Sequence, residues 1–401
     1  MNAFDAPFPD LGSEVPVAVA TAEAEAALAL GRLDGAFGAC PAPVARIFAG
    51  LVVRSALTRA LAQEGHAFTE QRFDAWFAGL VPLADGEATA LPRSAKVIAD
   101  IILAELAHSI WPPIAECARM LRPALMAGRD LAAPDAHEDT HATIADARAL
   151  IADLGAQTSP LPFAALGRLH ALVQRSARFA PAESATTIIQ VGDRQLSLER
   201  TLDRSPRWAL DLVYGELLRA TGFLTAALPC PGLVRLDALP DVDGSVSTDG
   251  PAMAQIIRAG ALRDVALEHL ANLARARDCA AWIGDGLSSL RASSRAPALC
   301  ELLAGFGAMR SAQIEAVLGK TRLGVRAILN TLFEAGLVTR TSVSGVWLYR
   351  FTPPSPQAEA SVEQHSSFAF SSEMLGEYEA ANAEIDRLLA GMEVETDSHL
   401  D

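Results

Sequence analysis

The sequence predicts a mainly α-helical protein, with a multi-helix body, then a small module of helices and paired strands, then an acidic C-terminal helix. Three observations support this fold class. Long stretches rich in Ala, Leu, Glu and Arg carry apolar residues every three or four positions. Paired strand-like runs stand out in two places, near 186–198 and 337–351. Acidic residues gather after residue 355.

The body is expected to begin after a flexible N-terminus at 1–20 and to form two helical domains, at 21–133 and 137–290. Proline and glycine separate its stretches of helical periodicity, which predict helices at 22–33, 44–63, 94–110, 113–126, 143–154, 163–179, 207–227 and 251–276. Gly192-Asp193 lies between two strand-like runs and predicts a β-hairpin in the second domain.

The stretch LGKTRLGVRAILNTLFEAGLV, residues 318–338, predicts a helix-turn-helix. Gly319 can adopt the positive φ that ends a helix, and Thr321 can cap the next helix. The two helices are expected to pack through an apolar stripe formed by Ile314, Leu318, Val325, Ile328, Leu329 and Leu332. A phosphate-binding loop ending at Lys320 is disfavoured, because it needs a glycine where Ile314 stands.

Strand-like runs at 337–341 and 346–351 flank residues 342–345 and predict a hairpin after the helix pair. A further helix is predicted just before the pair, at 297–305. Together these elements make a winged helix-turn-helix at 296–352. The module holds six basic and three acidic residues, a net charge of +3 in a chain whose net charge is −15. Such local basic charge is expected of a surface that contacts phosphate.

Double-stranded DNA is therefore the predicted partner. Arg322 and Arg326 occupy the first turns of the second helix and are predicted to reach base edges. The other candidates are three cations expected near phosphate, the residue at the hairpin tip and three neighbours on the helix: Arg310, Lys320, Arg340, Ser344, Thr321, Leu323 and Asn330. The alternative is a winged module that contacts other proteins, because a fold does not fix a function.

The chain after the module holds eleven acidic residues and one arginine between 355 and 401. A linker is expected at 353–371 and an acidic amphipathic helix at 372–392. This helix has a heptad seam with Asn382 at an inner position, through which two copies could pair as a homodimer. Docking on the body is the alternative, and the shortness of the seam slightly favours it.

One short motif suggests an enzyme. The segment HEDTH at 137–141 has the H-E-x-x-H spacing, which on a helix can place His137 and His141 around a zinc ion. Pro134 and Asp135 put this motif at the very start of a helix, and Asp139 is charged where such proteases usually carry an apolar or neutral residue. Helix capping is the favoured interpretation. We therefore predict no catalytic residue, no metal and no cofactor.

The five cysteines are scattered and form no CxxC pair, which predicts reduced thiols and a cytoplasmic protein. Cys230 lies between two prolines, and no motif ties it to a histidine or an acid, so it is expected to be a buried thiol. Charged residues interrupt the most apolar stretches, so no membrane span is predicted.

The stretch from SSLRASSRAP to EAGLV, with LPCPGLVRLDALP upstream and LALGRLDGAFGACP near the start, resembles a bacterial family. That family joins a helical domain of unknown function to a C-terminal helix-turn-helix. The resemblance covers most of the chain. It implies a DNA-binding end on a body without assigned chemistry.

A fainter similarity is to Fic-type nucleotidyl transferases, which have a helical body and often a segment like GRLDG at 31–35. The histidine and phosphate loop that their activity needs have no counterpart in 181–225, so this similarity implies no transfer activity. The sequence predicts a DNA-binding regulator of transcription. A helical interaction scaffold and a degenerate Fic-like protein are the alternatives.

Overall fold

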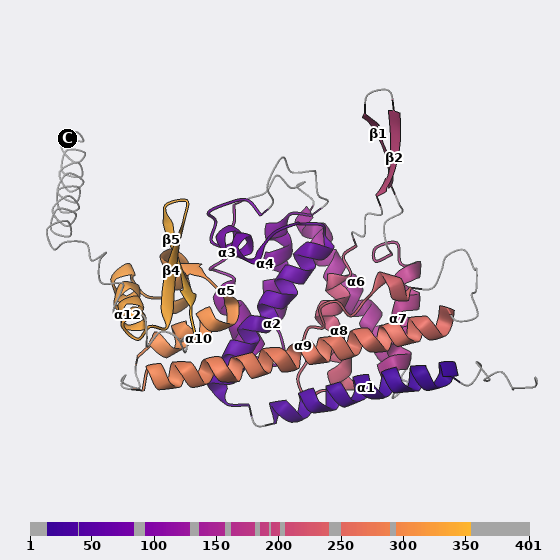
Figure 1. Cartoon of the computed structure of the whole chain (residues 1–401), viewed down its shortest axis with the longest axis horizontal. Coiled ribbons are helices and arrows are strands. Elements are labelled where there is room, and N and C mark those ends of the chain that lie inside the picture. The colour runs from indigo at the N-terminus through magenta and orange to yellow at the C-terminus, as the bar shows by residue number, and fades with distance from the viewer. Residues whose placement is uncertain are drawn as a thin grey trace, which may run out of the picture. The chain divides into compact units, whose positions relative to one another are not determined.

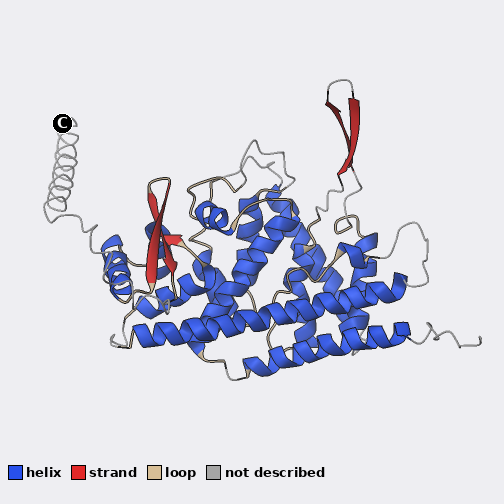
Figure 2. Ribbon diagram, viewed as in Figure 1, coloured by secondary structure: helices blue, strands red, loops and turns tan. Residues whose placement is uncertain are grey.

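The computed structural model describes residues 14–38, 40–83, 93–128, 136–156, 162–180, 185–191, 194–200, 205–239, 250–288 and 294–353. Helices dominate these ranges, which confirms the predicted mainly α-helical class (Figure 2). The helices are α1 Glu14–Phe37, α2 Ala42–Gln63, α3 Glu70–Phe77, α4 Ala95–Leu106, α5 Pro112–Leu121, α6 Ala136–Ala156, α7 Pro162–Arg175, α8 Trp208–Ala220, α9 Gly250–Gly286, α10 Ala296–Phe306, α11 Ser311–Leu318 and α12 Arg322–Glu334. The strands are β1 Ala185–Val191, β2 Arg194–Arg200, β3 Met309–Arg310, β4 Val338–Val343 and β5 Val346–Phe351.

The longest helix is α9, whose 37 residues span about 55 Å at the α-helical rise. It was predicted to end at Ala276, but Cys279 and Ile283 continue its buried face and carry the helix ten residues further. Helix α1 lies along α9 (Figure 1). Because α1 begins at Glu14, residues 14–20 are helical, although the sequence predicted a flexible end.

The central helix is α2, which packs against α4, α5, α8, α9 and α10. Buried residues occur around its whole circumference, as expected for a helix enclosed by others. One continuous apolar core runs from α1 through α2 into α10, α11 and α12. The chain through Pro353 forms one compact unit by its contacts.

Helix α3 has no counterpart among the predicted helices. The Thr69 hydroxyl caps it by accepting a hydrogen bond from the Arg72 amide at 3.2 Å. Its buried face is largely aromatic, formed by Phe73, Trp76 and Phe77. Eight residues rich in aromatic side chains have little intrinsic helix preference, which explains why periodicity alone missed the helix.

The predicted hairpin of the body is confirmed, since β1 and β2 pair antiparallel from Ala185 opposite Arg200 to Val191 opposite Arg194. The linker expected at 353–371 lies outside the described residues, apart from its first residue. The acidic helix expected at 372–392 lies outside them entirely.

Candidate nucleic-acid interface

Helices α11 and α12 form the predicted helix-turn-helix pair. Gly319 ends α11 with a φ of 58°, in the left-handed region that favours glycine. The Thr321 hydroxyl caps α12 by accepting a hydrogen bond from the Gly324 amide at 3.4 Å. Both capping roles expected from the sequence are confirmed. The predicted stripe faces inward, with Ile314, Val325, Leu329 and Leu332 buried and Leu318 and Ile328 partly buried.

A β-hairpin follows α12. Strands β4 and β5 pair antiparallel from Val338 opposite Phe351 to Val343 opposite Val346, and β3 adds a third strand beside β5. Ser344 and Gly345 make the turn with φ values of 50° and 78°. Two positive-φ residues are typical of the tight turn that joins twisted strands, so Ser344 lies at the hairpin tip as expected.

The outer face of α12 carries the predicted base-contacting residues. Arg322, Leu323, Arg326 and Asn330 are all exposed, as are Lys320 and Thr321 just before the helix. Leu323 is the most exposed large apolar residue of the described ranges, at 77%. Within those ranges no acidic side chain pairs with Lys320, Arg322 or Arg326, so their charge faces solvent.

Arg340 extends this basic surface onto the hairpin. Its guanidinium lies 4.5 Å from the ring centroid of Trp347 and 6.0 Å from that of Phe333 on α12. A guanidinium above an aromatic face gains cation–π stabilisation and stays planar and accessible. The indole of Trp347 is itself 44% exposed. The hairpin therefore presents a cation held in place by neighbouring rings.

Arg310 differs from the other candidate cations. Its guanidinium nitrogens Nη2 and Nε lie 2.9 and 3.3 Å from the sulfur of Met126, and the residue is half-buried on β3. Its backbone amide donates to the Gln313 side chain at 3.0 Å. These contacts turn Arg310 toward the helical body and away from the position of a phosphate-contacting cation that the sequence predicted.

Gln313 fixes α11 on the body. Its fully buried amide nitrogen donates to the carbonyl of Ala124 at 2.7 Å and to that of Phe77 at 3.2 Å. The two acceptors lie in segments that follow α5 and end α3. Because buried carbonyls require partners, this one side chain joins three segments of the fold.

A buried carboxylate fixes the hairpin in the same way. Asp74 on α3 accepts from Arg54 at 2.5 Å and from Arg350 of β5 at 2.7 Å. Arg54 also donates to the carbonyl of Phe306 at the end of α10 at 2.7 Å. Asp74 is 2% exposed, so the two arginines must balance the negative charge of its buried carboxylate. The hairpin, α10 and the body thus share one ionic cluster.

Helices α2 and α10 cross in close contact. A Cβ on Gly305 would lie 2.5 Å from the carbonyl oxygen of Ile47, and one on Gly50 would lie 2.9 Å from backbone atoms of Gly305. Beside the crossing, Arg46 and Glu301 form a two-bonded ion pair at 2.5 and 3.1 Å. Hydrogen bonding to Glu301 raises the pKa of Arg46. These contacts attach α10, at the start of the winged module, to the body.

The HEDTH segment lies on α6. Helix α6 begins at Ala136, so the HEDTH segment lies in its first turns, and the side chains of His137 and Glu138 are outside the described residues. Asp139 pairs with Arg93 and with Arg178, at 2.7 Å in both cases. Within the described ranges, no cluster of three potential metal ligands occurs.

Cys230 is buried, as expected, and burial raises the pKa of its thiol. None of the five cysteines is in a disulfide.

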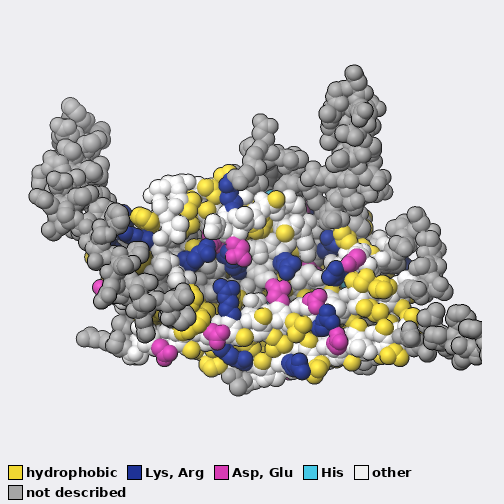
Figure 3. All heavy atoms as spheres, in the orientation of Figure 1, with side chains coloured by type: hydrophobic (Ala, Val, Ile, Leu, Met, Phe, Trp, Pro, Cys, Tyr) yellow, Lys and Arg dark blue, Asp and Glu magenta, His cyan; other side chains and the backbone are white. Residues whose placement is uncertain are grey.

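On the face seen in Figure 3, basic and acidic side chains are interspersed. The chain matches no protein-family model and no curated protein. Within the described part of the chain, none of the helices has the length and apolarity that a membrane crossing requires.

The structure adds contacts that sequence reasoning missed. Gln313 and its two carbonyl acceptors lie about 190 or more residues apart in the chain, and Asp74 and Arg350 are separated by 276 residues. No local spacing rule links residues so distant. The only available signal was that the polar Gln313 stands beside Ile314 of the predicted apolar stripe.

Proposed function

We propose that the protein binds double-stranded DNA through α12 and regulates transcription. One observation carries this proposal. Three exposed cations lie just before α12 or in its first turns and have no acidic partner in the described ranges: Lys320, Arg322 and Arg326. Solvent-facing cations at the N-terminal end of the second helix are typical of helix-turn-helix proteins that read the major groove. Because the apolar stripe of α12 is buried, the opposite face, which carries Arg322 and Arg326, is the one available to DNA.

The exposed residues divide into two roles. Arg322 and Arg326 reach base edges, where a bidentate arginine on guanine discriminates by about 1–3 kcal/mol. Leu323 between them offers an apolar contact of the kind that recognises a thymine methyl group. Lys320 and Arg340 contact phosphates, which gives affinity on any sequence.

A protein-contact surface is the second candidate. It is favoured by the exposure of Leu323 and Trp347, since exposed apolar groups also mark protein interfaces. In this alternative the helical body is an interaction scaffold. The proposal further places the protein in the cytoplasm, with its free thiols reduced, and allows pairing of two copies through the acidic helix. It includes no transfer of nucleotides.

Salt dependence separates the two candidates. DNA binding releases counterions, so the logarithm of the association constant should fall linearly with the logarithm of salt concentration. We expect the slope to become shallower by about one unit in Arg340→Gln, because one phosphate contact is lost. Asn330→Ala, which removes no charge, is the matched control and should leave the slope unchanged. Binding that is absent at low salt, or independent of salt, would reject the proposal.

A further inference from the structure

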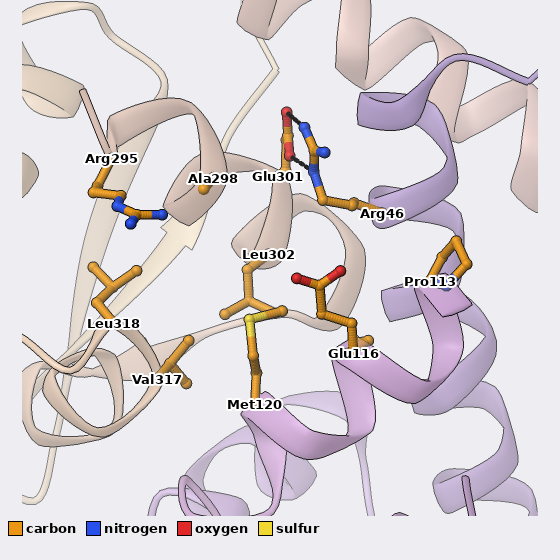
Figure 4. Close-up of a pocket in the computed structure, with 11 residues that line it drawn as sticks. Arg46, Pro113, Glu116, Met120, Arg295, Ala298, Glu301, Leu302, Val317 and Leu318 are labelled. Carbon is orange, nitrogen blue, oxygen red and sulfur yellow. Dashed lines mark hydrogen bonds and ion pairs between the residues drawn. The ribbon is translucent and has the colours of Figure 1, made fainter. Parts of the chain in front are cut away.

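A pocket of roughly 190 Å³ lies where the winged module meets the body (Figure 4). Helices α2 and α5 of the body form one side, and the start of α10 and the end of α11 form the other. Pockets for drug-sized ligands occupy about 300–1,000 Å³, so this one suits a smaller organic molecule. None of the DNA-contacting candidates lines it.

The walls are mainly apolar. Met120 of α5 and Leu302 of α10 lie in the middle of the view (Figure 4). Val317 and Leu318 of α11 line the left side of the pocket in this view. The ion pair between Arg46 and Glu301 borders the pocket, but its two charges already neutralise each other. A ligand must therefore bring an apolar part to gain from burial here.

Two further charged side chains border the pocket outside this ion pair, and one of them, Glu116, acts on Arg46 only through its charge, which helps to raise the pKa of that guanidinium. Glu116 of α5 and Arg295, which precedes α10, extend toward the space from different sides (Figure 4). Both are exposed, and neither forms an ion pair or hydrogen bond with another described residue. One carboxylate and one guanidinium at an apolar pocket complement a molecule that carries both an ammonium and a carboxylate group.

We propose that this pocket binds a small zwitterion with an apolar part, such as an apolar amino acid, and that binding adjusts the position of α12. The second half rests on the proposed function. Val317 and Leu318 immediately precede Gly319, whose left-handed conformation sets the turn into α12. A ligand that displaces the end of α11 therefore moves the residues that face DNA, while Gln313 keeps the beginning of α11 on the body.

Calorimetric titration of the full chain tests the binding. The probes are L-leucine and L-methionine, which carry both charged groups on one carbon, and ε-aminocaproate, which carries them at the two ends of an alkyl chain. Isovalerate and isoamylamine are the controls, because each lacks one charge. We expect at least one zwitterion to bind, and Glu116→Gln and Arg295→Gln each to weaken it about tenfold, the effect of losing a charge-assisted hydrogen bond.

Matched controls separate this effect from general damage. Glu334→Gln and Arg326→Gln remove the same charges from α12, outside the pocket, and should leave zwitterion binding unchanged. Ala298→Phe fills the pocket from an exposed position and should abolish binding without lowering the unfolding midpoint. The site is overturned if no zwitterion binds, if isovalerate or isoamylamine binds as well as the zwitterions, or if the pocket variants bind like the wild type.

The link to DNA has its own readout. With a bound DNA fragment, a saturating zwitterion should change the DNA dissociation constant at least threefold in the wild type and leave it unchanged in Ala298→Phe, which no longer binds the zwitterion. An unchanged constant in the wild type overturns the regulatory half alone. If zwitterions bind but no DNA does, the proposed function fails and the pocket stands.

Discussion

Replacing Gln313 by methionine should weaken the attachment of the winged module to the body. The two side chains are similar in size, so the change removes hydrogen bonds and leaves little empty volume. The carbonyl of Ala124 loses a 2.7 Å bond, and the amide of Arg310 loses its 3.0 Å acceptor. The carbonyl of Phe77 loses a weaker bond at 3.2 Å but still accepts from the amide of Met126.

These losses have a predictable magnitude. An unsatisfied buried carbonyl costs about 1–3 kcal/mol, and a lost capping acceptor costs about 1 kcal/mol. We therefore expect Gln313→Met to lower the free energy of unfolding by about 2–4 kcal/mol. Urea unfolding followed by circular dichroism measures it. Gln71→Met, at an exposed position on α3, is the control and should stay within about 0.5 kcal/mol of the wild type. A similarly small change for Gln313→Met would refute the reasoning.

Three other predictions concern packing, titration and the DNA-facing surface. Gly305→Ala should lower the free energy of unfolding in urea by about 1–3 kcal/mol, because its Cβ would meet a backbone carbonyl of α2. Gly260 has open space around it, so Gly260→Ala should be neutral or stabilising. Equal effects of the two substitutions would contradict the close crossing of α2 and α10. Burial raises the pKa of Asp211 to about 6, above its usual 3.8. This carboxyl therefore contributes most to the free energy of unfolding below pH 4, and about 3 kcal/mol of that contribution is lost as the pH rises through 6. Unfolding measured at pH 4.5 and 7.5 should show about 2 kcal/mol of this loss in the wild type and none of it in Asp211→Asn, and identical pH dependence would disprove it. Trp347→Ala should remove the platform of Arg340 and weaken binding to all DNA sequences by about 0.5–1 kcal/mol in fluorescence anisotropy, and an effect on one sequence only would argue against a phosphate-contacting role.

The helix-turn-helix could be predicted from the sequence because its determinants are local. The left-handed Gly319, the capping Thr321 and the stripe through Val325 and Leu329 all lie within a dozen residues of one another. Spacing and backbone preference report such features directly. The same applies to the β1–β2 hairpin, whose turn is marked by Gly192-Asp193.

The attachment of the module to the body could not be predicted. Charge and periodicity present Arg310 as one more cation beside the helix pair, yet the structure directs it to Met126, 184 residues away in the chain. Likewise, no sequence pattern indicates that two distant helices cross in close contact at Gly305 and Gly50. Single-sequence reasoning detects elements and not the apolar faces that they share.

The central claim is that α12 reads DNA sequence. Genomic DNA fragments retained by the purified full chain should be sequenced in parallel with those retained by an Arg322→Ala, Arg326→Ala double variant. We expect the wild type to enrich a shared site and the variant to lose this enrichment while remaining folded. A wild type that enriches no site at moderate salt, or a double variant that enriches the same site equally well, would contradict it.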